Sequence, residues 1–380
     1  MLNLASLKRA AEKQMVRELR RVRTEYPQEH IYAGMFFLFY GDGGRLHWPC
    51  VAVGTKESLA SLQEQYQARG SDGDPTTLRF SAADLPHMAE PTENEAQLAA
   101  QASDEAAALG SEDAWDEYYD RFVAVFPEAA RAARRRAVAE GLIDEDCVVL
   151  ALDEEMELLT ASLTGEELAR HFPELEEDRR RIAALPPRER VESVLDVLLR
   201  RVDGPVLSRP EGMGMLRTAP EIAATALLPV LNGDGVGFRE AARIAAGLGE
   251  PTAQLIEVLD QVVADDNRDA SDRAAAGGAL SCLGRMDLVV QRVEELPDDV
   301  LAPALVAPYR FSNTFGTLNY RPLEAVFTAH PRTHDLVAAH PHLPCEIHAH
   351  ELAEVERGAE SSWGFIREHA AQVITELLDG

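Results

Sequence analysis

The stretch MFFLFYGDGGRLHWPCVAVGTKESLASL, residues 35–62, decides the fold prediction for this chain. Two apolar runs, near 31–40 and 46–53, flank the tetrapeptide GDGG, which supplies the positive-φ positions that a hairpin turn needs. We therefore predict two antiparallel strands joined by a tight turn. Tyr40 and Trp48 are the expected packing anchors, and we interpret the unit as framework.

A helix is expected directly after the second strand. Thr55 can cap its N-terminus, Glu57 lies in its first turn, and the helical pattern continues to about Ala68. Other short elements extend this half of the chain. They are a helix over 4–25, a strand candidate over 77–80, an acidic connection or exposed helix over 84–113, an aromatic helix around 115–126, a buried strand near 144–153, and a helix opened by a capping box at 164–167.

The second half shows helical periodicity without any strand pattern. Pro187, Pro220 and Pro251 each open an apolar helical stretch at nearly equal intervals, and Thr218 and Glu221 are in capping-box register. Further helices fit 269–283, 286–295, 298–307, 320–329, 346–356 and 362–378. Helix pairs at this spacing suggest an irregular HEAT-like array, and a compact helical bundle is the alternative.

Chain length supports two domains, because 380 residues exceed what one hydrophobic core usually serves. We expect an α+β N-terminal domain with a small antiparallel sheet over residues 1–180. We expect an all-α domain, HEAT-like or a bundle, over residues 186–380.

Composition narrows the classes of partner. The formal net charge of −28 disfavours nucleic acid and anionic membranes and is compatible with a basic protein partner. No apolar run approaches the length of about 20 residues that spans a bilayer. The four cysteines are scattered without a CxxC pair, which indicates buried free thiols and a cytoplasmic location. The Ala/Arg-rich usage is typical of a high-GC bacterium.

Histidines gather in AHPRTHDLVAAHPHLPCEIHAHELAE, which holds six of the 11 in the chain between His330 and His350. The candidate metal ligands are His342, Cys345, His348 and His350. His330 and His334 have a chelating i, i+4 spacing, but Pro331 moves His330 away from helical geometry. Because the segment lacks the HExxH order, solvated or helix-terminal histidines are the simpler interpretation, and we assign no metal or other cofactor.

A second unusual segment, PYRFSNTFGTLNYRP at 308–322, is aromatic and polar without helical periodicity. Loops on rigid scaffolds often carry binding residues, so a partner surface could use four of its side chains. These are Arg310, Asn313, Asn319 and Arg321. The alternative is a loop between helices that is fixed by its aromatic residues.

The remaining motifs predict no chemistry. GDGVG (233–237) and EGMGM (211–215) lack the Lys-Ser/Thr end of a phosphate loop and do not lead from a strand into a helix, so we interpret both as turns. The acidic runs DEEME and ELEED are interpreted as solvated helical faces. The serines occur in no nucleophile elbow.

The N-terminal half resembles the DUF4303 family, a bacterial domain of unknown function. Three stretches carry the resemblance over roughly residues 5 to 175. They are RELRRVRTEYPQEHIYAGMFFLFYGDGGRLHWPCVAVGTKESL, WDEYYDRF and AEGLIDEDCVVLALDEEMELLTASL. The resemblance brings no established catalytic residues. It implies binding more than chemistry, because such domains occur in toxin–immunity and other interaction-type gene neighbourhoods.

The sequence thus favours a non-enzymatic protein-interaction module, with an immunity-like role as one form of it. An enzyme of unrecognised type, metal-dependent through the histidines between His330 and His350, is the alternative.

Overall fold

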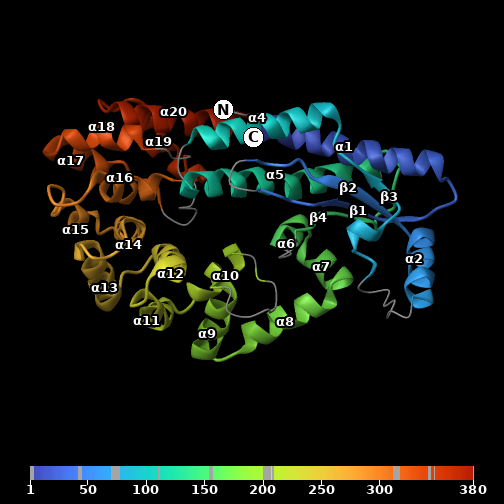
Figure 1. Ribbon diagram of the computed structural model, residues 1–380, viewed down its shortest axis with the longest axis horizontal. Helices are drawn as coiled ribbons and strands as arrows, with labels where there is room; N and C mark the ends of the chain where they lie inside the picture. The colour runs from blue at the N-terminus through green and yellow to red at the C-terminus, as the bar shows by residue number, and fades with distance from the viewer. Residues whose placement is uncertain are drawn as a thin grey trace. The chain divides into compact units, whose positions relative to one another are not determined.

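The computed structural model describes residues 4–41, 45–69, 78–109, 112–153, 157–199, 207, 209–310, 317–340, 344–345 and 347–379. The chain divides into two compact units, Met1–Glu177 and Asp178–Gly380 (Figure 1). An α+β unit is followed by an all-α unit, which confirms the predicted fold class. Along the described ranges, none of the helices has the length and apolar character needed to cross a membrane.

Unit 1 is built on a four-stranded sheet in the order β3-β2-β1-β4. The strands are β1 (Ile31–Phe37), β2 (Cys50–Thr55), β3 (His87–Ala89) and β4 (Val148–Ala151). β2 pairs antiparallel with both β1 and β3, whereas β4 pairs parallel to β1, with Met35 opposite Leu150. The sheet is therefore mixed and departs from the antiparallel expectation at β4. A strand pair that is separated by helices can run parallel, because the connection is long enough to cross over.

Helices cover both faces of this sheet. Those of unit 1 are α1 (Leu4–Glu25), α2 (Lys56–Ala68), η1 (Ala82–Asp84), α4 (Glu93–Ala108), α5 (Glu112–Ala139), α6 (Glu157–Ser162), α7 (Gly165–His171) and α8 (Pro173–Ala184), which continues past the unit boundary. α1 packs against α5 and both contact β1, while α6 and α7 lie on the opposite side of the sheet (Figure 1).

The alternation of side chains along β1 explains this layering. Gly34 lies against Met15 of α1 and Phe36 packs edge-on against Phe126 of α5. Ala33, Met35 and Phe37 belong to the cluster formed with α2, α6 and α7. Successive residues of a strand point to opposite faces, so a strand that is covered on both faces is apolar throughout. Every residue of β1 is buried.

Several local predictions for unit 1 are confirmed. Thr55 caps α2: its hydroxyl accepts from the Ser58 backbone N–H at 3.1 Å, and Ser58 completes a capping box. Thr164 caps α7 with Glu167 in the same way. Trp48 is buried at 4% exposure and donates its indole N–H to Gln14 Oε1 at 2.8 Å.

Other local predictions are wrong. Tyr40 is 50% exposed, because β1 ends at Phe37. The strand expected over 77–80 is replaced by a turn at Arg79 and Phe80, and the third strand is β3. β3 has three residues, so its pattern is too short to recognise in the segment expected as connection or helix. The helix alternative for that segment is confirmed by α4, which Thr92 caps with Glu95.

Unit 2 is a succession of helices. They are α9 (Pro187–Leu198), α10 (Arg209–Leu216), α11 (Pro220–Leu231), α12 (Gly235–Gly247), α13 (Ala253–Ala264), α14 (Ala270–Cys282), α15 (Met286–Val290), α16 (Asp298–Val306), η2 (Ala307–Tyr309), α17 (Arg321–Ala329), α18 (Arg332–Ala339), η3 (Ala349–Glu351), α19 (Leu352–Ala359) and α20 (Gly364–Asp379).

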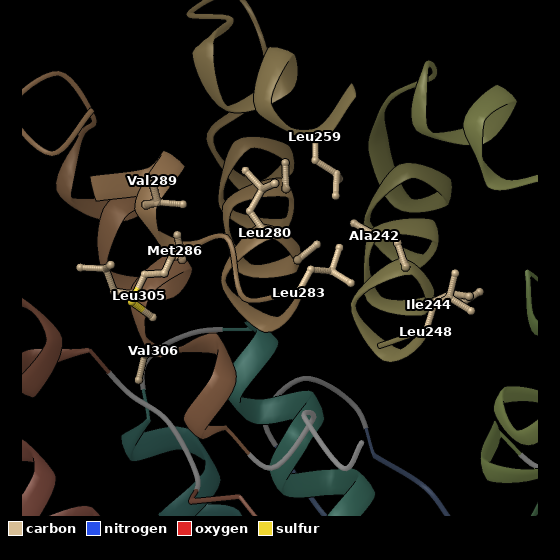
Figure 2. Packing of buried hydrophobic residues seen from close by; sticks show 14 of the residues in the cluster. Ala242, Ile244, Leu248, Leu259, Leu280, Leu283, Met286, Val289, Leu305 and Val306 are labelled. Carbon is tan, nitrogen blue, oxygen red and sulfur yellow. The ribbon is translucent and has the colours of Figure 1, made fainter. Parts of the chain in front are cut away.

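Packing in this unit follows chain order. α11 contacts α12 and α13, α14 contacts α12, α13 and α16, and α16 contacts α18. Figure 2 shows side chains of successive helices, such as Ala242, Leu259 and Leu280, in one apolar cluster. Contact between each helix and its near neighbours occurs in stacked helical repeats and in helical bundles, so both expected forms of the all-α unit remain.

Helix starts in unit 2 differ in detail from the prediction. Pro187 and Pro220 do open α9 and α11. The capping box expected at Thr218 is wrong, because this hydroxyl donates backward to the Met215 carbonyl at 2.7 Å. α13 begins after Thr252, which caps it and leaves Pro251 outside the helix. The two glycine-rich pieces that were interpreted as turns contribute to α10 and to the start of α12.

Candidate functional site

An apolar crevice of about 240 Å³ lies where β1 and β4 end. It is lined by residues 37–40, which follow β1, by residues 152–153, which follow β4, and by residues 80–83, which lead into η1. Because β1 and β4 are parallel, their carboxyl ends meet at the same edge of the sheet. Ligands of open sheets with parallel strands bind outside this edge, between the loops that follow the strands.

Backbone strain marks the crevice. Leu38, the first residue after β1, has φ of 63°, and it is the one non-glycine residue with positive φ among those that the structure describes. Leucine in this left-handed region costs about 1–2 kcal/mol, because Cβ comes close to the following carbonyl oxygen. The Leu38 side chain remains 40% exposed, so the strain holds an apolar group in solvent at the mouth of the crevice.

Aromatic residues of α5 fix the segment that carries Leu38. Phe39 packs edge-on against Phe126, with ring centroids 5.3 Å apart. Trp115 and Tyr119 stack with their rings 5.6 Å apart and nearly parallel, and Gly41 lies directly against both. A Cβ at Gly41 would come within 2.7 Å of Trp115 Cη2, so glycine is required for this close approach.

The opposite wall is built on Phe80, whose ring lies 4.4 Å from that of Phe172. The Arg79 guanidinium lies 5.1 Å from the Phe80 ring and 5.3 Å from the Tyr32 ring, and its Nη2 is 3.2 Å from His171 Nδ1. Burial, reinforced by the charge of Arg79, lowers the pKa of His171, which favours the neutral ring that accepts this hydrogen bond. Burial raises the pKa of Tyr32 to about 12, so its hydroxyl stays a donor, to the Arg79 carbonyl at 2.6 Å.

Ser81 and Asp153 are polar residues of the lining, and Asp84 follows the lining segment 80–83 in the chain. The exposed Asp84 carboxylate accepts hydrogen bonds from the hydroxyls of Ser81 and Tyr66, and the hydrogen bond to Asp84 raises the pKa of Tyr66. Asp153 Oδ1 accepts from the Leu158 backbone N–H at 3.0 Å. A mainly apolar lining with a few polar residues is suited to burying an apolar group of a ligand.

The candidate metal ligands lie in different surroundings. Cys345 is buried, whereas His348 and His350 are exposed and stack on each other at 5.7 Å. His342 lies outside the described residues. Across the described ranges, no group of three or more His, Cys, Asp or Glu side chains is placed to hold a metal ion.

The other three histidines of this segment lie at helix ends or contact them, and His340 directly follows α18. His330 terminates α17 with a non-helical backbone, as the following proline predicts. His334 Nε2 accepts from the Phe365 backbone N–H at 3.3 Å, and its Nδ1 is 2.9 Å from Asp335 Oδ1.

Cys345 belongs to a buried polar network that the sequence did not indicate. His369 of α20 is 1% exposed; its Nε2 lies 2.7 Å from the Tyr309 carbonyl oxygen and its Nδ1 lies 2.6 Å from the Tyr320 hydroxyl. The carbonyl can only accept, so Nε2–H donates to it and Nδ1 accepts from Tyr320. Burial raises the pKa of both tyrosines. The Cys345 Sγ is 4.0 Å from Nε2, too far for efficient proton transfer. The hydrogen bonds of His369 join α20 to Tyr309 and Tyr320.

The predicted partner-binding residues divide between core and surface. Arg310 is only 9% exposed and forms a β-bridge with Pro344, so its burial removes it from the predicted surface. Asn319 and Arg321 are exposed, and Asn319 Oδ1 accepts from the Arg321 backbone N–H at 3.1 Å. Asn313 lies outside the described residues.

Comparison with known proteins assigns no family to the chain and no function to the crevice. No protein-family model matches the sequence, and no curated protein matches it. The resemblance to DUF4303 therefore stays a prediction, and the crevice is interpreted from its own chemistry.

Proposed function

We propose that the protein is a non-enzymatic binding protein and that its α+β unit takes an apolar side chain of a protein partner into the crevice beside β1 and β4. The observation that carries this proposal is the exposed, strained Leu38 at the crevice mouth. Residues held in sparsely populated backbone regions concentrate at binding and catalytic sites, where the surrounding structure maintains them.

The size of the crevice favours a side chain over a cofactor. At about 240 Å³ it is smaller than the roughly 300–1,000 Å³ typical of sites that enclose a drug-sized ligand. It exceeds the roughly 150 Å³ cavity that accepts a benzene ring. One large apolar side chain therefore fits, and the rest of the partner would lie on the surface around it.

Two further features support a protein partner. Stacked helical repeats, the arrangement that we propose for unit 2, commonly present extended binding surfaces. The net charge of −28 favours a basic protein over nucleic acid. An immunity-like role, in which the partner is a basic toxin, is one form of this proposal and rests on the resemblance to DUF4303. The free cysteines are compatible with the proposed cytoplasmic location.

Site-specific photo-crosslinking in the native cell tests the proposal. The photoreactive residue p-benzoylphenylalanine replaces Ala83, an exposed residue of the crevice lining. The control position is Val236 in unit 2, which is 74% exposed. We expect position 83 to give a discrete protein adduct that is lost when Leu38→Asn is introduced into the same chain.

Mass spectrometry of the adduct identifies the partner. Failure of position 83 to form an adduct, or the same adducts from positions 83 and 236, would show that the crevice is not a protein-binding site.

A further inference from the structure

We propose that Arg79 and His171 form a second binding site, which takes the carboxylate group of a ligand. Arg79 belongs to the turn before η1, and His171 is the last residue of α7. Neither residue belongs to the lining of the crevice, so this site can be tested separately from the proposed function.

Arg79 is a half-buried cation whose side chain contacts aromatic rings and a histidine. Its guanidinium lies 5.1 Å from the Phe80 ring and 5.3 Å from the Tyr32 ring, and Nη2 donates to His171 Nδ1 at 3.2 Å. Within the ranges that the structure describes, no carboxylate pairs with Arg79. A partly buried charge without an ionic partner is unfavourable, so a ligand that supplies this partner is bound favourably.

Other arginines close to α7 do have carboxylate partners. Arg134 pairs with Glu167 at 2.8 Å, and Arg170 pairs with Glu166 at 2.9 Å. The chain holds 65 Asp and Glu residues, yet the polar partner of the Arg79 guanidinium is an imidazole ring. This arrangement keeps the charge of Arg79 available to a ligand.

His171 holds Arg79 without neutralising it. Burial and the charge of Arg79 lower the pKa of His171, so the ring is neutral at pH 7 and its Nδ1 accepts from the guanidinium. A guanidinium has two edges that can each donate two parallel N–H groups to a carboxylate, and this single hydrogen bond leaves one edge complete. The Tyr32 hydroxyl donates to the Arg79 carbonyl oxygen at 2.6 Å, so the backbone and the side chain of Arg79 are both fixed. A donor that is fixed before binding loses little conformational entropy when the ligand binds.

The charge and the shape of this site fit a carboxylate. Arg79 contributes one positive charge, which a singly charged carboxylate balances, and the planar edge of its guanidinium matches two carboxylate oxygens. The net charge of −28 gives an anion no long-range attraction, so direct contact with Arg79 must hold it. The Tyr32 and Phe80 rings beside the guanidinium lower the local dielectric constant, which strengthens the ion pair. The ligand is therefore a small organic acid or the carboxylate at the end of a polypeptide.

A titration with acetate, followed by nuclear magnetic resonance, tests the site in the full-length protein. The histidine rings are labelled with ¹³C at Cε1, and His171→Gln identifies the His171 signal by its loss. Sodium acetate replaces sodium chloride at constant ionic strength. We expect a saturable shift of the His171 signal with acetate and none with acetamide, which is similar in size but uncharged.

The pKa of His171 gives a second readout. Besides Arg79, the charged groups that act on this ring are Arg170, Glu167 and Asp146. A bound carboxylate offsets the Arg79 charge that lowers the pKa of His171, so the pKa measured from the same signal should rise when acetate saturates the site. If Arg79 only braced the fold, acetate would leave this pKa unchanged.

Two substitutions of Arg79 separate its charge from its shape. Arg79→Gln removes the charge and the paired donors, whereas Arg79→Lys keeps the charge and loses the pair. We expect each variant to bind acetate at least about 10-fold more weakly than the unaltered protein, since each loses a charge-assisted hydrogen bond. The control, Arg188→Gln, removes the same charge from a side chain of unit 2 that pairs with Glu192 and is 83% exposed, and it should bind acetate like the unaltered protein. Circular dichroism checks that each variant is folded.

Equal shifts with acetate and acetamide, or unchanged acetate binding by Arg79→Gln, would overturn the site. Tighter binding of inorganic phosphate than of acetate would overturn its assignment to a carboxylate, because the second phosphate charge has no counterpart in Arg79. N-acetylglycine, which carries the carboxylate of a polypeptide end, distinguishes the two sources. Binding at least as tight as that of acetate supports a polypeptide C-terminus, and weaker binding supports a small organic acid. The crosslinking at position 83 tests the crevice independently of these results.

Discussion

Leu38 combines a backbone conformation that leucine rarely adopts with a side chain that is 40% exposed. Asparagine tolerates the left-handed region better, because its short polar side chain can hydrogen-bond locally. We expect Leu38→Asn to raise the free energy of unfolding by up to about 1 kcal/mol, since relief of strain outweighs the loss of a partly exposed side chain. Urea denaturation followed by fluorescence measures the change.

Leu352→Asn is the matched control for this substitution. Leu352 is 43% exposed, but its φ of −52° is ordinary helical geometry. Asparagine is the poorer helix former, so this variant should lose about 0.5 kcal/mol. If Leu38→Asn is destabilised as much as the control, the packing of Leu38 outweighs its strain, and the support that strain gives to a binding role is removed.

Gly277 determines how closely α14 and α16 approach each other. A Cβ at this position would lie 2.7 Å from the Ala304 Cβ, closer than real Cβ contacts allow. Gly277→Ala should therefore push the two helices apart and destabilise unit 2 by about 1–3 kcal/mol. Thermal unfolding followed by circular dichroism at 222 nm measures the loss.

The same methyl group at Gly237 of α12 should have the opposite effect. A Cβ there meets no atom within 4 Å, so Gly237→Ala gains about 0.5–1 kcal/mol of helix propensity without a clash. If Gly277→Ala and Gly237→Ala were both stabilised, helix propensity and not the contact between α14 and α16 would control the change in stability.

Glu57 joins the start of β1 to the first turn of α2. Its carboxylate accepts from the His30 backbone N–H at 2.8 Å and lies 2.6 Å from His30 Nδ1, and these bonds lower the pKa of Glu57 to about 2 from 4.5. Because the pKa of Glu57 is lower in the folded state, its ionised carboxylate contributes fully to the free energy of unfolding above about pH 4.5. This contribution is lost as the pH falls toward 2. The side chain is 41% exposed, so solvent screening keeps the effect small.

Glu57→Gln should therefore be less stable than the unaltered protein at pH 7, and the difference should shrink as the pH falls to 3. Urea midpoints at pH 7, 5, 4 and 3 give this comparison. A difference in stability between the two proteins that stayed constant from pH 7 to pH 3 would show that the Glu57 charge does not stabilise the fold through His30.

The sequence predicted helices and strands better than it predicted the crevice. Thr55 and Thr164 cap their helices through residues three positions away, so the relevant pattern is contiguous. The direction of β4 depends on a pairing with β1 across more than a hundred residues, which no local pattern encodes. The end of β1 at Phe37 was hidden because residues on both sides of it are apolar. For the same reason the crevice, which begins there, could not be predicted.

At the scale of the whole molecule, each unit has an apolar core of its own. One cluster joins the sheet to α2, α6 and α7, and another extends from Ile182 to Val373. Units with separate cores can unfold in separate transitions. Cys147 in unit 1 and Cys282 in unit 2 can report these transitions, because burial raises the pKa of each thiol to about 12 and only the thiolate reacts quickly.

Pulsed iodoacetamide labelling along a urea series, read by mass spectrometry, should give different midpoints for Cys147 and Cys282. The two variants above supply the internal test. Gly277→Ala should lower the Cys282 midpoint and leave that of Cys147 unchanged, whereas Leu38→Asn should move only the Cys147 midpoint. Each substitution acts within a single unit, so its effect stays in that unit unless the two units unfold together. If each variant shifted the urea midpoints of Cys147 and Cys282 equally, the two units would unfold in one cooperative transition, in spite of the boundary near Glu177.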